Sequence, residues 1–184
     1  MYSGYDSPLG SLTIYFDGAL RGLWMEGQAN FPADITQIHA TPATGFVAAT
    51  GFVAATGPVA DWLDAYFAGE NPAVTFEVAP EGTPFQQAVW SALRDIPYAT
   101  TTTYAALASV VGKRLNRTTS ARAIGGAVGR NPVMLVAPCH RVLASDGTLA
   151  GFSGGLERKA WLLDHERGTG HGRSGPGDPG TAAT

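Results

Sequence analysis

Cysteine is almost absent from this 184-residue chain, which contains only Cys139. A single thiol cannot form a disulfide within the chain, and it cannot supply the cysteine pair of a typical zinc site. With one cysteine and no export signal, we expect a reducing, cytoplasmic setting. Free cysteines are usually buried and unreactive, so a chemical role for Cys139 needs support from the rest of the sequence.

Long apolar runs are also missing. No stretch is long enough to span a bilayer, and the N-terminus lacks the charged-then-apolar layout of a signal peptide. We therefore expect neither a membrane segment nor a signal peptide. The apolar fraction of 45% is ordinary for a globular protein, and the length suits one large or two small domains.

Basic side chains are nearly absent from residues 1–82, where Arg21 stands against nine acidic residues. Residues 83–166 instead contain nine basic and five acidic residues. An acidic half joined to a basic half indicates a nucleic-acid partner for the second half. A solvated basic face without a ligand is the alternative.

The first half predicts a small α+β unit. Residues 11–16 alternate between apolar and polar side chains, and residues 20–25 return after an Asp17-Gly18 turn, which predicts a β-hairpin. Residues 27–57 lose this periodicity and contain the hexapeptide Gly-Phe-Val-Ala-Ala-Thr twice in tandem, which is typical of a tolerant low-complexity loop.

Helices dominate the rest of the prediction. Thr83 and Gln86 form a capping box with proline at the first helical position, so a helix and a new domain begin there. The remaining expected elements are a helix from Pro58 to just before Gly69, a strand at 74–78, helices at 84–94, 103–110, 120–129 and 156–166, and a disordered tail at 167–184. A basic connection, residues 112–117, separates the third and fourth of these helices.

The helix expected at 120–129 carries the adjacent glycines Gly125 and Gly126. Each glycine weakens a helix by roughly 1 kcal/mol relative to alanine, so this helix needs a compensating reason for both. Its smooth Ala/Gly face suits close packing against another helix. It equally suits insertion into a nucleic-acid groove, with Arg122 as the only large side chain on that face.

Cys139 itself has unusual neighbours. Pro138 precedes it, His140 and Arg141 follow it, and residues 133–136 form an apolar run before it. This pattern predicts a short buried strand that delivers the thiol to a polar edge, where cationic groups favour the thiolate.

Taken together, residues 83–166 resemble the O6-alkylguanine-DNA alkyltransferase family, which includes the methylated-DNA–protein-cysteine methyltransferases. The motifs that carry the resemblance are Pro84-Phe85-Gln86, Val89-Trp90, Ile96-Pro97-Tyr98, Tyr104-Ala105-Ala106-Leu107-Ala108, Ala121-Arg122-Ala123-Ile124-Gly125-Gly126, Asn131-Pro132, Pro138-Cys139-His140-Arg141-Val142, Ser153-Gly154-Gly155 and Trp161-Leu162-Leu163. They follow the family's order, and Pro-Cys-His-Arg-Val is highly specific. Residues 1–82 match the family only loosely.

The resemblance implies an α+β fold: a small N-terminal antiparallel sheet with a helix in residues 1–82, joined to a mostly helical domain, residues 83–166, that contains a helix-turn-helix. It implies direct-reversal DNA repair, in which an alkyl group moves once and irreversibly from O6-alkylguanine to Cys139. The implied partner is double-stranded DNA carrying that lesion. We expect a monomer without a cofactor, metal, membrane or obligate protein partner.

The resemblance also assigns catalytic roles. Cys139 would attack as the thiolate, with His140 as its base through a water molecule and Glu166 orienting the histidine. Tyr104 would donate to the leaving guanine, and Asn131 would link the Ala/Gly helix to the segment that carries the cysteine. Helix packing is the ordinary explanation for Tyr104, and an Asn-Pro turn is the ordinary explanation for Asn131.

The lesion lies inside a duplex, so its nucleotide must be flipped out. Arg122 would fill the vacated space while the small-residue face lies in the minor groove. The implied groove contacts are Ala121, Ala123, Gly125 and Gly126, the implied phosphate contacts are Lys113, Arg114, Arg117 and Arg130, and the implied contacts to the base and its alkyl group are Val142, Phe152, Ser153 and Gly154.

Three features depart from the vertebrate pattern. The connection between the two DNA-binding helices is longer. Phe152 replaces a tyrosine in the loop near the alkyl group, which bears on the range of alkyl groups and on whether O4-alkylthymine is accepted. The structural zinc of vertebrate members, held partly by cysteines, cannot exist here in the same form.

Three other functions compete with this interpretation. A non-catalytic alkylated-DNA lesion binder would lack the cysteine. A helix-turn-helix regulator needs side chains that read base edges, which an Ala/Gly helix does not provide. A cysteine hydrolase needs a separate histidine near the thiol, and the remaining ones, His39, His165 and His171, stand in no telling context.

Overall fold

The computed structural model describes residues 1–32 and 54–168. Its elements are, in chain order, β1 (Tyr2–Ser7), β2 (Gly10–Phe16), β3 (Leu20–Met25), α2 (Pro58–Phe67), α3 (Pro84–Arg94), β4 (Thr102–Thr103), α4 (Tyr104–Arg114), α5 (Ala121–Val128), the 3₁₀ helix η1 (Cys139–Arg141), β5 (Val142–Leu143) and α6 (Leu156–Glu166). The α+β class is therefore confirmed. Most of the predicted loop at 27–57 and nearly all of the predicted tail lie outside the described residues.

The N-terminal sheet is antiparallel in the order β1-β2-β3. The predicted hairpin is confirmed, because β2 pairs with β3 from Leu12–Met25 to Phe16–Leu20 and Gly18 turns with a φ of 95°. The first strand, β1, was not predicted. It pairs with β2 along its whole length through a tight turn, from Tyr2–Tyr15 to Ser7–Gly10.

Two segments that were predicted as strands are not strands. The expected strand at 74–78 makes only one bridge, between Val78 and Leu20, because it meets β3 only at that strand's first residue. The apolar run at 133–136 is a turn with one bridge, between Val133 and Leu23, and Leu135 adopts a φ of 68° that no strand allows. Both segments nevertheless satisfy backbone groups on the free edge of β3.

The predicted helices are present. Thr83 and Gln86 form the expected capping box of α3, and α2 and α6 span the predicted residues. The helix α4 runs to Arg114, past its expected end, so the predicted basic connection begins inside the helix and only residues 115–120 link α4 to α5. The chain then folds back on Gly112, where an added Cβ would lie 2.8 Å from the Arg117 carbonyl oxygen.

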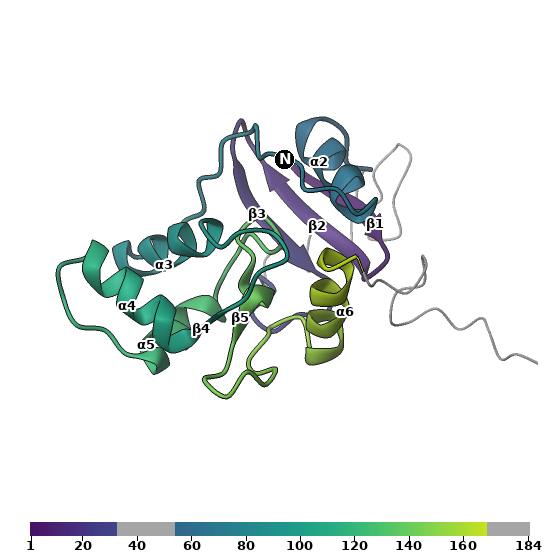
Figure 1. Cartoon of the computed structure of the whole chain (residues 1–184). Coiled ribbons are helices and arrows are strands. Elements are labelled where there is room, and N and C mark those ends of the chain that lie inside the picture. The colour runs from purple at the N-terminus through teal and green to yellow at the C-terminus, as the bar shows by residue number, and fades with distance from the viewer. Residues whose placement is uncertain (33–53, 169–184) are drawn as a thin grey trace, which may run out of the picture.

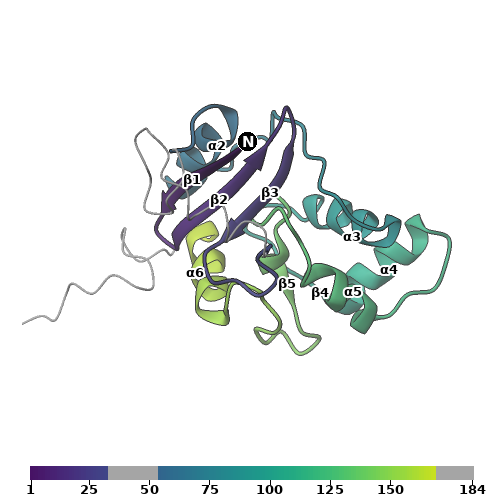
Figure 2. The same cartoon turned by 180° about the vertical axis from the view of Figure 1, so that it is seen from behind.

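The buried core is continuous from the sheet to the helices. It includes Leu12 and Leu23 from the sheet, Leu63 from α2, Leu93 from α3 and Ile124 from α5. Figures 1 and 2 show β4 and β5 between the α3–α5 group and α6. The division at residue 82 and the helix-turn-helix interpretation of α4 and α5 stay predictions. In the described part of the chain, no helix is long and apolar enough to cross a membrane.

Candidate active site

Cys139 begins η1 and is 2% exposed. Burial raises the pKa of its thiol, while a hydrogen bond from Asn131 and the positive charge of Lys159 act in the opposite direction. The expectation that the flanking cations favour the thiolate was wrong in two respects. Burial outweighs the charges, and the nearby cation comes from α6, because the side chains of His140 and Arg141 bind Glu166 instead.

Asn131 follows α5 and binds the segment that leads to the cysteine. It is buried, its amide donates to the Ala137 carbonyl oxygen at 2.7 Å, and its side-chain oxygen accepts from the Val133 N–H at 3.1 Å. These two bonds hold the 133–137 turn closed. They explain why an apolar run that suits a strand forms a turn here.

Lys159 is a residue of the site that the sequence interpretation missed. It is fully buried, and its ammonium group donates to the carbonyl oxygens of Val142 and Ala150, each at 2.6 Å. Burial lowers its pKa to about 8, while the negative charge of Cys139 raises it. The ammonium group therefore ties β5 to Ala150 in the loop between β5 and α6.

A helical pattern could have found Lys159. The buried face of α6 consists of Lys159, Leu162, Leu163 and Glu166, which is the i, i+3, i+4, i+7 spacing of one helix face. Leu156, the first residue of the same helix, is 48% exposed. A lysine within an apolar stripe was the available signal.

Behind the cysteine, His140 and Glu166 form a buried pair. Nε2 of His140 lies 2.7 Å from Oε1 of Glu166, and neither side chain is exposed. Burial lowers the pKa of His140, although Glu166 opposes this shift. Nδ1 of His140 is buried and has no hydrogen-bond partner in the described part of the chain.

Glu166 is the centre of a larger hydrogen-bond network. Arg141 donates to both carboxylate oxygens at 2.8 and 2.9 Å, Tyr66 donates to Oε1 at 2.8 Å, and the Ala99 N–H donates to Oε2 at 3.1 Å. Burial by itself raises the pKa of Glu166, but the hydrogen bonds and charges of His140 and Arg141 lower it well below its usual range. The carboxylate is therefore ionised although it is buried.

A cavity of about 650 Å³ opens beside α5. Five of the predicted site residues line it: Tyr104, Ala121, Gly125, Phe152 and Ser153. The hydroxyl of Tyr104 lies 2.9 Å from the carbonyl oxygen of Gly151 and 3.1 Å from that of Ala150. Burial raises the pKa of Tyr104, and the charge of an ionised Cys139 raises it further. Tyr104, in the wall of the cavity, is therefore within electrostatic range of the thiol.

The loop after β5 forms another wall of this cavity. Gly154 is buried, and an added Cβ would lie 2.8 Å from the Phe152 ring and 3.0 Å from the Met25 sulfur, so a side chain here would displace the loop. The Ser153 carbonyl oxygen accepts from the Ala29 N–H at 2.9 Å. Val142 is fully buried and contributes its backbone, whose carbonyl oxygen Lys159 binds.

The small-residue face of α5 does not pack against another helix. Ile124, Ala127 and Val128 form the buried face, whereas Ala121, Ala123 and Gly126 are exposed. Arg122 is exposed on the same helix. Close helix packing therefore does not explain the two glycines.

The predicted phosphate contacts differ in their surroundings. Lys113 is exposed at the end of α4. Arg114 forms an ion pair with Asp95 at 2.5 Å, the guanidinium of Arg117 lies 5.0 Å from the centre of the Phe85 ring, and Arg130 donates to the Gly126 carbonyl oxygen at 3.0 Å. A phosphate would therefore have to compete with these partners for the three guanidinium groups.

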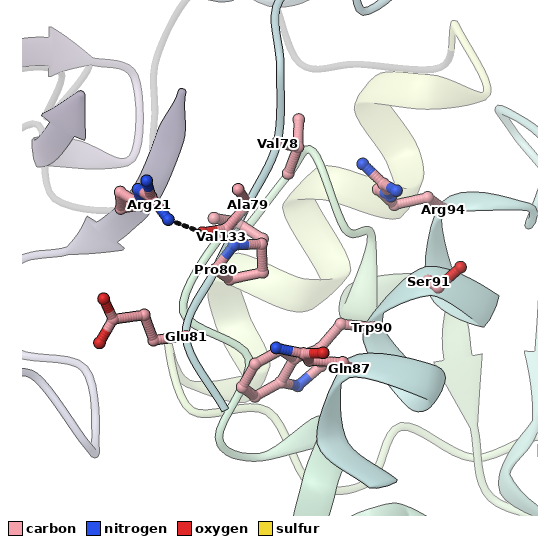
Figure 3. A pocket seen from close by; sticks show the side chains of 10 residues that line it. All are labelled: Arg21, Val78, Ala79, Pro80, Glu81, Gln87, Trp90, Ser91, Arg94 and Val133. Carbon is pink, nitrogen blue, oxygen red and sulfur yellow. Dashed lines mark hydrogen bonds between the residues drawn. The ribbon is translucent and has the colours of Figure 1, made fainter. Parts of the chain in front are cut away.

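A second cavity, of about 410 Å³, lies between β3, residues 78–81 and α3. Figure 3 shows Arg21 bound to the Ala79 carbonyl oxygen at its edge. None of the predicted site residues lines it. In residues 1–32 and 54–168, no group of three or more His, Cys, Asp or Glu side chains could hold a metal ion.

Comparisons with known proteins identify relatives of the chain. Residues 84–168 match the DNA-binding domain of 6-O-methylguanine DNA methyltransferase. The methylated-DNA–protein-cysteine methyltransferase of Mycobacterium tuberculosis H37Rv is 41% identical over 167 residues, covering 90% of this chain and 92% of the relative. The enzyme of that name from Salmonella typhimurium LT2 is 49% identical over 109 residues, 59% of this chain and 61% of the relative.

A solved structure agrees with these matches. The crystal structure of Mycobacterium tuberculosis OGT in complex with DNA superposes on this chain with a TM-score of 0.72 at 35% identity. The match covers 94% of this chain and 96% of that one. The similarity therefore includes the N-terminal sheet, which the sequence motifs hardly covered.

Proposed function

The chain belongs to the methylated-DNA–protein-cysteine methyltransferase family, and from that membership we propose that it repairs O6-alkylguanine in DNA by moving the alkyl group to its own Cys139. The observation that carries the residue assignment is the position of this cysteine. This buried cysteine directly precedes His140, which pairs with Glu166, and its charge acts on Tyr104, a residue that lines the cavity beside α5.

The reaction is one displacement. The sulfur attacks the alkyl carbon, an S–C bond forms, and the bond between that carbon and guanine O6 breaks with its electron pair going to the base. The thiol proton passes to His140 through a water molecule, the guanine anion takes a proton from Tyr104, and the tyrosinate regains a proton from solvent as His140 releases its own. The products are a thioether and unmodified guanine, so each chain reacts once.

His140 is suited to accept the proton. Burial keeps its imidazole neutral by lowering its pKa. If Nε2 carries the hydrogen and donates to Glu166, Nδ1 has the free lone pair, and it is the ring nitrogen without a partner among residues 1–32 and 54–168. Glu166 then stabilises the imidazolium as it forms.

The thiolate must form in a site that raises its pKa. The side-chain amide of Asn131 and the positive charge of Lys159 both act to lower the pKa of the Cys139 thiol. Both interactions favour the charged form, and they offset part of the cost of burial. The sulfur becomes reactive when its proton leaves through His140.

DNA binds along α5 in this proposal. The exposed Ala/Gly face enters the minor groove, and Arg122 fills the space left by the flipped nucleotide. Lys113, Arg114, Arg117 and Arg130 contact phosphates, and Val142, Phe152, Ser153 and Gly154 contact the flipped base. Phosphate contacts of this kind make binding sensitive to salt and nearly independent of sequence.

We place the reaction in the cytoplasm, because a lone reactive thiol persists in a reducing compartment. The chain acts as a monomer with DNA as its partner. The non-catalytic lesion binder is disfavoured, because such a protein has no use for a cysteine backed by a base and a carboxylate.

Stoichiometry tests the proposed function. The protein is mixed with an excess of duplex DNA in which one O6-methylguanine carries a radiolabelled methyl group. We expect one label per protein molecule at completion, with the excess lesions left intact. Catalytic turnover, or tight binding without transfer, would contradict the proposal.

A further inference from the structure

Tyr66 connects the N-terminal half to the active-site carboxylate. It lies in the last turn of α2, it is 1% exposed, and its hydroxyl donates to Oε1 of Glu166 at 2.8 Å. The roles assigned above to the catalytic residues do not use this bond. The two residues are 100 positions apart in the chain.

The hydroxyl of Tyr66 is held in place. Its ring stacks on Trp62 with centroids 5.3 Å apart, and the His165 ring binds the Tyr66 carbonyl oxygen at 2.7 Å. Contacts from α2 and α6 therefore fix the backbone and ring together. The phenol cannot swing away from Glu166 without disturbing the core.

Oε1 of Glu166 is shared by three donors. Nε2 of His140 lies at 2.7 Å, Nη2 of Arg141 at 2.8 Å and the Tyr66 hydroxyl at 2.8 Å. Donors to one oxygen compete for its electron density, so each weakens the hold of that oxygen on the others. The Tyr66 bond therefore limits how strongly Glu166 attracts the proton of His140.

The other groups that face this pair are few. Among the described residues, η1 contributes Arg141, the connection between α3 and β4 contributes Tyr98 and the Ala99 N–H, and α6 contributes Lys159, whose charge opposes protonation of His140. Tyr98 provides a natural comparison. Its hydroxyl is buried without a hydrogen-bond partner in this part of the chain, and its ring lies under the Arg141 guanidinium, 5.5 Å from ring centre to Cζ.

We propose that Tyr66 is a positioning residue for the transfer reaction, through which the N-terminal half sets the basicity of His140. The inference rests on the proposed function, because it gives His140 the role of base. It assigns residues 1–82 a chemical task beyond packing. Without the hydroxyl, Glu166 holds the imidazolium more strongly, and His140 stays protonated to a higher pH.

The test is the pH dependence of transfer in the full-length protein. Tyr66→Phe removes only the hydroxyl, and the rate of methyl transfer from duplex DNA carrying O6-methylguanine is measured from pH 5 to pH 8. In this variant we expect the acidic limb of the pH–rate profile to move to higher pH by about half to one unit. This is the free energy of one hydrogen bond expressed as a pKa change. Tyr98→Phe is the matched control and should leave the limb in place.

A second measurement separates positioning from folding. NMR titration of the His140 ring should show a higher pKa in Tyr66→Phe and no change in Tyr98→Phe. A lower melting temperature with an unmoved limb would show that Tyr66 is only structural, and equal shifts in both variants would also overturn the inference.

If Tyr66→Phe does not fold, 3-fluorotyrosine at position 66 replaces it. Its more acidic hydroxyl donates more strongly, so the limb should move to lower pH, and an unmoved limb overturns the inference. The wild-type protein in the same assay tests the proposed function separately. Absence of transfer by the wild type contradicts the function, whereas transfer with unshifted variants contradicts only the role of Tyr66.

Discussion

The imidazole of His140 and the carboxylate of Glu166 meet 2.7 Å apart with no exposed surface on either side chain. His140 directly follows the cysteine, and Glu166 is the last residue of α6. A carboxylate at a helix C-terminus is unfavourable when it is exposed. Here the donors from η1, α2 and the α3–β4 connection compensate for it.

Replacement of Glu166 by Gln tests this network. The variant leaves the buried Arg141 without its counter-charge, which should cost about 3–5 kcal/mol of unfolding free energy. Transfer should fall by about 100-fold or more, because His140 loses the carboxylate that makes it an effective general base, and general-base catalysis contributes about 10²- to 10⁴-fold. Denaturant unfolding and single-turnover rates measure the two effects. Glu157→Gln, an exposed position on the same helix, is the control, and equal behaviour of the two variants would contradict the role of Glu166.

Stability should decrease on acidification in two stages. The pKa of His140 is lower in the folded state, so the unfolded chain binds the extra proton first and stability declines below about pH 6.5. The pKa of Glu166 is also lowered, so its contribution is present above about pH 4.5 and is lost as the pH falls below that value. Melting temperatures from pH 7 to pH 3 should show both stages. In His140→Gln the first stage should be absent, and an unchanged profile would refute the assignment.

Local sequence patterns predicted the hairpin and the helices correctly. They failed where a distant partner decides the local structure. Residues 133–136 have the apolar pattern of a strand, but the side chain of Asn131 closes them into a turn. The cation that lowers the pKa of the thiol is likewise Lys159 on α6, whereas the two basic residues beside Cys139 in the sequence bind Glu166.

Tyr66 shows the same limit more sharply. It lies on the buried face of α2 with Val59, Trp62 and Leu63, which is the apolar spacing of a helix. The hydrogen bond from its hydroxyl to Glu166, however, depends on the packing of α2 against the end of α6, and no local sequence pattern contains that information. The N-terminal half therefore looked uninformative in sequence, although it contributes to the surroundings of the carboxylate.

Lys159→Gln should make the thiol less acidic. The variant removes the positive charge that favours the thiolate and leaves the Val142 and Ala150 carbonyl oxygens with a weaker donor. We expect the pKa of Cys139 to rise by about one unit and transfer near neutral pH to slow accordingly. Thiolate ultraviolet absorbance measures this directly, since the chain has one cysteine. Cys139→Ala supplies the baseline, and an unchanged thiol titration would rule out the electrostatic role.

Arg122→Ala should affect duplex repair selectively. Loss of the side chain that fills the vacated stack should slow transfer from duplex DNA by about 10- to 100-fold, because flipping costs a few kcal/mol. Reaction with free O6-methylguanine base should be nearly unchanged. Arg94→Ala, an exposed arginine on α3 outside this surface, should alter neither rate. Equal losses on both substrates would show that Arg122 acts elsewhere than in flipping.

The most direct measurement is the mass of the protein and of its Cys139 peptide after reaction with duplex DNA that carries one O6-methylguanine. Transfer replaces the thiol hydrogen by a methyl group, so the intact chain should gain the mass of one CH₂ unit, located on Cys139, and Cys139→Ala should gain nothing. An unchanged mass in the wild type, or a methyl group on any other residue, would contradict the assignment of this sulfur as the acceptor.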